Sequence, residues 1–238
     1  MQAKQYRFSP FAVFLTLSTG VLAASLAHAE APMNVDDAGT LDKGGMKIEG
    51  VWSKDDRPRG GELVFGFSPI DDLELEVGAG RAHDRSAHPA TRFDGLGFGA
   101  KWVPYQNEKE WSLGARIDVG HIRVKDRETP DRFTERSYAL TGLASYRFEN
   151  EQVLHLNLGT ERVRAKGERD TAGTWGIGYE FPLAEGLQLI VEAFGAEDSR
   201  PDRAVGLRYE ILQGLKVSGA VGRGDGRSLG QAGIAWEF

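Results

Sequence analysis

Apolar residues recur at every second position in one short segment after another, and no sustained helical spacing is found after residue 44. A period of two is typical of β-strands with one apolar and one polar face. Twelve such segments can be counted, and their apolar sets follow in chain order. They are Met46, Ile48, Trp52; Leu63, Phe65, Phe67; Leu73, Leu75, Val77; Leu96, Phe98, Trp102; Trp111, Leu113, Ile117, Val119; Leu140, Ala144, Tyr146, Phe148; Leu154, Leu156, Leu158; Trp175, Ile177, Tyr179, Phe181; Leu187, Leu189, Val191; Val205, Leu207, Tyr209; Leu215, Val217, Val221; and Ile234, Trp236, Phe238.

The connections between these segments alternate between compact turns and mostly longer, charged stretches. The compact set is 69–72, 104–110, 149–152, 182–186 and 212–214, and the charged set is 53–60, 81–91, 123–135, 162–171, 195–202 and 223–228. An even number of strands with such alternation is typical of outer-membrane barrels, which have short periplasmic turns and longer external loops. We therefore predict an all-β fold, a closed antiparallel up-and-down transmembrane β-barrel of about 12 strands, within a range of 10 to 12.

Positions of the opposite parity are polar or small, so the pattern places them inside the barrel, where carboxylates can pair across strands or contact water. The predicted lumen-lining residues are Glu49, Glu62, Glu74, Glu76, Lys101, Arg116, Asp118, Arg147, His155, Glu180, Glu192, Arg208, Glu210 and Lys216. Twelve strands enclose a lumen wider than an eight-stranded barrel and narrower than a sixteen-stranded porin. A narrow channel would fit these dimensions. A lumen closed by its own ion pairs would fit them too.

The tryptophans fall on the apolar parity near strand ends, as expected for indole rings at the two interfaces of a bilayer. The predicted girdle consists of Trp52, Trp102, Trp111, Trp175, Trp236 and Phe238. A soluble β-sandwich would instead bury its tryptophans in mid-strand, so the positions of these residues disfavour a sandwich.

The chain begins with Lys4 and Arg7, an apolar stretch from about residue 8 to 26, and the small-residue triplet 27–29. This order is typical of a Sec-type signal peptide cleaved before Glu30. We predict three parts: a cleaved signal peptide at 1–29, an N-terminal segment at 30–44 and the barrel at 45–238. The segment 30–44 is polar and aperiodic, so it could hang in the periplasm or insert into the lumen. The predicted location is the bacterial outer membrane.

At the other end of the chain, Gln231 and Gly233 precede alternating hydrophobic residues that finish with Trp236 and Phe238. This arrangement resembles the signal by which the barrel-assembly machinery recognises outer-membrane proteins. The resemblance implies that machinery as a partner. Because the predicted barrel is closed, this last strand must pair with the first, at Met46 to Trp52.

A second resemblance covers the opening strands, 43–49 and 65–77, with the sequences KGGMKIE and FGFSPIDDLELEV. They are similar to the opening strands of outer-membrane channels of the phenol-degradation MetA-pathway type. The resemblance implies a barrel fold and transport of small molecules. It carries no functional residues over to this chain.

Composition excludes several other classes of function. The formal net charge of −6 argues against a nucleic-acid partner, for which a basic surface is expected. The absence of cysteine excludes disulfides and thiolate metal sites. The residue pattern indicates no metal site and no cofactor.

The leading functional hypothesis is a narrow passive channel for small solutes, with outer-membrane lipid and lipopolysaccharide as its surroundings. One alternative is a non-conducting structural or adhesive barrel that acts through its external loops. A second is a lipid-modifying enzyme that uses His121 as a base, for which Ser137 is the nearby nucleophile candidate. No catalytic residue is assigned, because the pattern favours interface anchoring of His121.

Overall fold

A computed structural model describes residues 30–87, 90–107, 109–126, 132–224 and 226–238. The predicted signal peptide lies outside these described residues. They form twelve strands: β1 (Met46–Asp55), β2 (Arg59–Ile70), β3 (Leu73–Asp84), β4 (Thr91–Tyr105), β5 (Trp111–Asp126), β6 (Arg132–Arg147), β7 (Val153–Ala165), β8 (Glu168–Ala184), β9 (Leu187–Ala196), β10 (Asp202–Leu212), β11 (Leu215–Gly224) and β12 (Arg227–Glu237). The described residues contain no helix long and apolar enough to cross a membrane.

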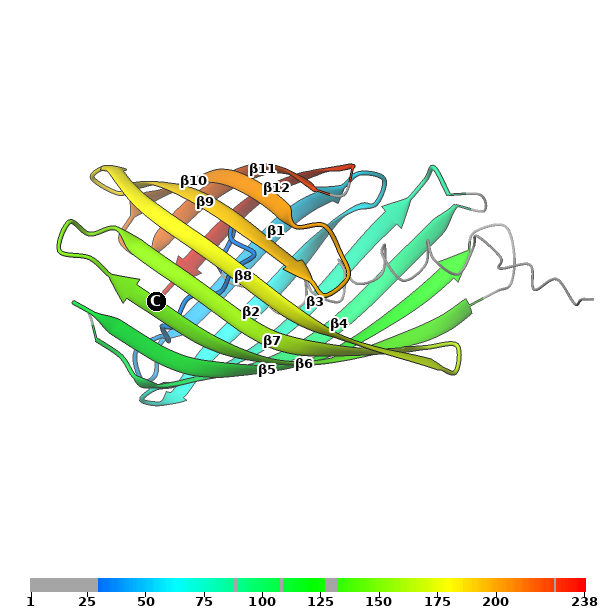
Figure 1. The fold of residues 1–238 in the computed structure, drawn as a ribbon, viewed down its shortest axis with the longest axis horizontal. Helices are drawn as coiled ribbons and strands as arrows, with labels where there is room; N and C mark the ends of the chain where they lie inside the picture. Colours follow the sequence, from blue (N-terminus) through cyan, green and yellow to red (C-terminus); the bar gives the residue numbers. More distant parts are fainter. Residues whose placement is uncertain (1–29, 88–89, 108, 127–131, 225) are drawn as a thin grey trace, which may run out of the picture.

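Each strand pairs antiparallel with its neighbours in the chain, and β12 pairs with β1 to close the barrel (Figure 1). At the seam, Ile48 lies opposite Trp236. The main chains of Met46 and Phe238 exchange hydrogen bonds of 2.8 and 2.9 Å there. The predicted twelve-stranded fold and the predicted seam are therefore confirmed. We call the end that holds Met46 and Phe238 the terminal end, and the opposite end the distal end.

The outer wall has apolar side chains along its middle, because the register keeps every residue of one parity on one face. Leu63, Leu96 and Ile117 are 60%, 56% and 55% exposed, although they are large and apolar. At the terminal end, an aromatic row crosses β5 to β8, with ring centroids 4.5 to 5.9 Å apart along the row. It consists of Trp111, Tyr146, Phe148, Tyr179 and Phe181.

At the distal end, the prediction of long charged loops is wrong for several connections. Strands β7 and β8 are joined by Lys166 and Gly167 alone, not by a ten-residue loop. Both residues have positive φ, 50° and 87°, the backbone conformation of a tight hairpin turn that glycine favours. The connections from β1 to β2 and from β11 to β12 are similarly short. Parts of the predicted loops 81–91 and 123–135, namely 88–89 and 127–131, lie outside the described residues.

The physical reason is that the distal strands continue beyond their apolar residues. β5 and β6 have 16 residues each and β8 has 17, whereas about 9 to 11 suffice to cross a bilayer. In these extra residues the outward positions are mostly basic, and the inward positions are acidic or apolar. The sequence analysis relied on alternating apolar residues, and it therefore predicted loops at these positions.

Candidate functional site

The strand register places the predicted lumen-lining residues on the inner face of the barrel. Nine of them are buried: Glu49, Glu74, Glu76, Lys101, Arg116, His155, Glu180, Glu192 and Arg208. Glu62, Asp118 and Lys216 are partly exposed. Arg147 and Glu210 lie at the terminal rim and are exposed, so they stand at the mouth of the lumen and not in its enclosed part.

The segment 30–44 lies inside the barrel, where its main chain donates hydrogen bonds to side chains of the wall (Figure 1). Glu30 lies beside Lys216 near the terminal end, Val35 contacts Gly176 of β8, and Gly44 donates a hydrogen bond to Ser68 of β2. The side chains that accept these bonds belong to five strands, β1, β9, β7, β6 and β3. The bonds are Ala31 N to Glu49 Oε1 at 2.6 Å, Val35 N to Glu192 Oε1 at 2.8 Å, Asp36 N to Asn157 Oδ1 at 2.7 Å, Ala38 N to Ser145 Oγ at 2.7 Å and Leu41 N to Glu74 Oε2 at 3.2 Å.

Ion pairs fix the middle of the segment to the opposite wall. Lys101 Nζ on β4 lies 3.0 Å from Asp36 Oδ1 and 2.9 Å from Asp37 Oδ1. Desolvation raises the pKa of the Asp37 carboxyl, but the charge and hydrogen bond of Lys101, together with the other nearby cations, hold that pKa below its ordinary value. Arg116 Nη1 on β5 lies 3.2 Å from Asp36 Oδ2.

Charged side chains of the barrel wall near Asp36 and Asp37 also pair with one another. Lys47 Nζ lies 3.0 Å from Glu74 Oε1 and 2.8 Å from Glu76 Oε1. Arg116 donates to Glu76 and, through Nε at 2.8 Å, to Asp118. On the far side, Arg208 Nη1 lies 3.0 Å from Glu180 Oε1, and Ser145 Oγ lies 2.8 Å from His155 Nδ1. The network holds these side chains in place, so the segment contacts a preorganised wall.

Apolar contacts between the segment and the wall were missed by the sequence analysis, which expected only polar or small inward residues. Met33 packs with Ile190, and Ala38 packs with Val103 and Leu143. Because segment 30–44 has no periodicity, nothing in the sequence pointed to these pairs.

An inward glycine on β8 provides space for the segment. A Cβ atom on Gly176 would lie 2.9 Å from Val35 Cγ2, closer than real Cβ contacts. The sequence analysis placed such glycines inside the barrel, but alternation alone could not show which of them face another chain segment.

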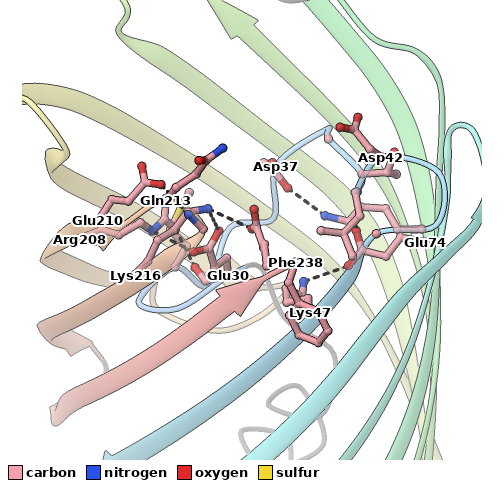
Figure 2. A pocket seen from close by; sticks show the side chains of 18 of the residues that line it. Glu30, Asp37, Asp42, Lys47, Glu74, Arg208, Glu210, Gln213, Lys216 and Phe238 are labelled. Atoms are coloured by element: carbon pink, nitrogen blue, oxygen red, sulfur yellow. Dashed lines mark hydrogen bonds and ion pairs between the residues drawn. The ribbon is translucent and has the colours of Figure 1, made fainter.

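A cavity of about 680 Å³ remains between the segment and the terminal ends of the surrounding strands (Figure 2). Charged side chains line it, among them Glu30, Lys47, Glu74 and Lys216. Lys216 Nζ lies 2.9 Å from Glu30 Oε2 and 3.0 Å from Glu237 Oε1. The cavity is therefore polar and opens at the same end as Phe238.

The distal half of the lumen is acidic. Glu62, Asp118, Glu135 and Glu161 lie on inward positions of β2, β5, β6 and β7. Asp118 and Glu161 are both register partners of Ala139, so they lie at one level on either side of β6. An inner apolar cluster of Ala82, Phe93, Ile122 and Val124 lies on the distal parts of β3 to β5.

The residues proposed for an enzymatic site lie on opposite faces of the wall. His121 lies opposite Arg136 on the outer face, whereas Ser137 is 5% exposed on the inner face and lies opposite Gly120. The strand separates the imidazole from the hydroxyl, so these two residues cannot form a nucleophile and base pair.

Among the residues of the predicted girdle and assembly signal, the aromatic ones lie on the outer face of the barrel and the other two lie on the inner face. Trp52, Trp102, Trp111, Trp175, Trp236 and Phe238 are all on the outer face and between 40% and 57% exposed. The rings of Trp236 and Phe238 contact each other at a centroid distance of 4.8 Å. Gln231 and Gly233 face inward, and Gln231 Nε2 donates to Asn34 Oδ1 at 2.9 Å.

A family model described as "Uncharacterised conserved protein UCP029691" matches residues 17–224, which is most of the chain. The chain belongs to this family. No curated protein matches the sequence.

Solved structures of the same architecture are similar to this member of the family. The KdgM porin in complex with disordered oligogalacturonate has a TM-score of 0.57 at 13% identity, covering 81% of this chain and 99% of the porin. The translocator domain of autotransporter NalP from Neisseria meningitidis has a TM-score of 0.60 at 10% identity, covering 97% and 98%. The COG4313 outer membrane channel from Pseudomonas putida F1 has a TM-score of 0.56 at 10% identity, covering 85% and 98%. At these identities the likeness shows the fold, and the expected resemblance to outer-membrane channels is confirmed at that level.

Proposed function

We propose that this protein is a narrow passive channel for small polar solutes in a bacterial outer membrane, with segment 30–44 as its constriction. The chain is exported by its signal peptide and cleaved before Glu30. The terminal end faces the periplasm, and the distal end faces the outside. The assembly machinery recognises the last strand through its alternating residues and the terminal aromatic pair, Trp236 and Phe238.

The outer wall supports this location. A closed barrel has no free strand edge, so its main-chain groups are all paired within a bilayer. The exposed aliphatic side chains would contact acyl chains, and the aromatic row from Trp111 to Phe181 would lie at the periplasmic interface.

One observation carries the channel proposal. All twelve strand pairings are made within residues 46–238, and the seam between β1 and β12 does not involve the segment. The segment attaches to the wall through hydrogen bonds and ion pairs that water can replace, and through small apolar contacts at Met33 and Ala38. Its displacement would therefore leave a closed barrel with a polar lumen.

The charge of the lumen favours some solutes over others. Glu62, Glu135 and Glu161 line the external half, where carboxylates would attract cations and repel anions. The KdgM porin structure holds an oligogalacturonate, which is a polyanion. The acidic external half of this chain favours neutral or cationic solutes instead.

Planar-bilayer recording tests the proposal. We expect small steps from the full-length mature protein and steps several-fold larger from a variant that lacks residues 30–44. Heat-modifiable gel migration of both proteins verifies that each barrel is folded. Absence of steps from the folded deletion variant, together with no solute flux into proteoliposomes, would contradict the channel and favour a non-conducting structural barrel.

A disulfide lock tests the role of the segment separately. The chain has no cysteine, and Ala38 N lies 2.7 Å from Ser145 Oγ. We expect the double variant Ala38→Cys/Ser145→Cys to conduct less than the unchanged protein when it is oxidised. Its conductance should recover after reduction. Ala38→Cys alone is the control. Equal conductance of the oxidised and reduced double variant would show that the segment does not limit flow.

The lipid-modifying alternative has no support from the placement of His121 and Ser137 on opposite faces. Its experiment is simple. Any lipid hydrolysis by the purified protein that disappears in His121→Ala would favour the enzyme over the channel.

A further inference from the structure

Lysine and arginine are concentrated on the outer face of the distal strand ends, which we call the basic belt. Its thirteen members, assigned by register, are Lys54, Arg59, Arg81, Arg92, Arg123, Lys125, Arg132, Arg136, Arg162, Arg164, Arg169, Arg203 and Arg223. Among the described residues, Asp94 is the one carboxylate at an outward distal strand position. Acidic residues of the same strand ends, such as Glu135 and Glu161, take the opposite parity.

Asp94 neutralises little of the positive charge around it. Its Oδ1 lies 2.7 Å from Arg81 Nε and 2.9 Å from Arg92 Nη2, and its Oδ2 lies 3.6 Å from Lys125 Nζ. Arg123 is its register partner on β5. Four cations thus surround one anion, and their mutual repulsion favours binding of further anionic groups.

A groove of about 1100 Å³ runs across this part of the outer wall. Trp52, Leu63 and Ile234 line its apolar part, and Arg81, Arg92 and Arg123 line its charged part. Gly61 and Gly95 also line the groove. A molecule that fits this surface needs acyl chains beside an anionic headgroup.

A second hollow of about 380 Å³ lies further round the belt, between β5 and the β7–β8 hairpin. Arg136, Arg164 and Arg169 line it together with His121. Arg164 is the register partner of both Arg136 and Arg169. Guanidinium groups in such numbers match phosphate geometry better than they match single carboxylates.

We propose that the basic belt binds the phosphorylated headgroup of an outer-leaflet lipid, with acyl chains against the apolar part of the Trp52–Leu63–Ile234 groove. The lipid class is a phosphorylated glycolipid of the lipid A type. This inference rests on the outer-membrane location proposed above, but not on conduction through the lumen. It also assigns a role to His121, which borders the second hollow.

Native mass spectrometry of the full-length mature protein in detergent micelles tests the proposal. We expect retention of diphosphorylated lipid A, with weaker retention of dephosphorylated lipid A and of a zwitterionic phospholipid. Apparent affinity in Arg81→Gln/Arg123→Gln should fall by about tenfold or more, because two charge-assisted contacts are lost. Arg81→Lys/Arg123→Lys should lose less affinity than the Gln variant, because the charges remain although the paired guanidinium donors are lost.

The matched control removes two positive charges at the terminal end of the barrel, away from the basic belt, through Lys109→Gln and Arg147→Gln. It should bind lipid A as the unchanged protein does. Heat-modifiable migration verifies folding of every variant. Three results would overturn the proposal: equal binding by the Gln double variant, equal binding of dephosphorylated lipid A, or full competition by millimolar inorganic phosphate. Mass spectrometry detects the bound lipid directly, so the binding result does not depend on whether the lumen conducts.

Discussion

At the residue scale, Arg116 links the wall of the barrel to the segment inside it. The side chain is 3% exposed and contacts three carboxylates, those of Asp36, Glu76 and Asp118. The planar guanidinium has five N–H donors, which suits it to this junction. Lysine at the same position could not bond all three carboxylates in the same geometry.

Arg116→Met should therefore destabilise the barrel strongly, because it leaves buried carboxylates without their cation. A loss of roughly 3 to 5 kcal/mol in the free energy of unfolding is expected for the removal of one partner of a buried ion pair. Urea unfolding in lipid vesicles measures it. Arg147→Gln, at the exposed terminal rim, is the control and should change stability by less than about 0.5 kcal/mol.

Gly176 is the second informative residue, since its missing side chain provides the space occupied by Val35. Gly176→Val should push the segment out of place, raise its sensitivity to protease and increase conductance toward that of the 30–44 deletion. Gly230→Val is the matched control, because a Cβ atom on Gly230 would have no neighbour within 4 Å. Unchanged protease sensitivity in folded Gly176→Val would show that Val35 does not depend on this contact.

At the element scale, segment 30–44 behaves as a short insert held by the wall. Its backbone donors find side-chain acceptors on separate strands, so it needs no secondary structure of its own to satisfy them. The lowered pKa of Asp37 makes part of this attachment depend on pH.

The direction of that dependence follows from the sign of the shift. A carboxyl with a lowered pKa stabilises the bound segment above its ordinary pKa of 3.8, and this contribution is lost as pH falls below that value. Asp37→Asn should therefore loosen the segment at pH 7, measured by protease sensitivity. The difference from the unchanged protein should shrink as pH is lowered below 3.8. A difference that stays constant with pH would contradict an electrostatic role for Asp37.

At the scale of the whole molecule, parity separates the charges of the distal end. Bases such as Arg136 and Arg164 face outward, and acids such as Glu135 and Glu161 face the lumen. The two proposals above rest on this separation, with anionic lipid outside and cationic or neutral solute inside.

The selectivity of the open barrel follows from the inner face. In the 30–44 deletion variant, Glu62→Gln/Glu161→Gln should lower the preference for K⁺ over Cl⁻, because the acids that attract cations are lost. Reversal potentials in a salt gradient measure this preference. Glu149→Gln/Glu185→Gln, in turns at the terminal end, is the control. An unchanged reversal potential in the Glu62 and Glu161 variant would show that the external half does not select ions.

Much of the fold could be predicted from the sequence, because alternation is a local property of each strand. Leu63, Phe65 and Phe67 need only their own spacing to show a strand with one apolar face. The same period of two, applied along the whole chain, predicted the number of strands and the seam between Met46 and Phe238. It failed at Arg162 to Thr171, where the outward positions are basic or polar instead of apolar.

The candidate site could be predicted only in part. Parity placed Glu49, Glu192 and Arg116 on one face, but it could not say what they contact. Their partners Ala31, Val35 and Asp36 lie in an aperiodic segment that carries no spacing signal. For Glu192 and Arg208, the contacts also join residues more than a hundred positions apart in the sequence.

The sequence by itself thus determined the strands, their faces and the closure of the barrel, since each rests on the period of two. Only the tertiary structure decided that segment 30–44 lies inside the lumen, which glycines make room for it, and how the distal charges divide between the two faces of the wall. These features depend on strand register and closure, which bring together residues that no local pattern relates.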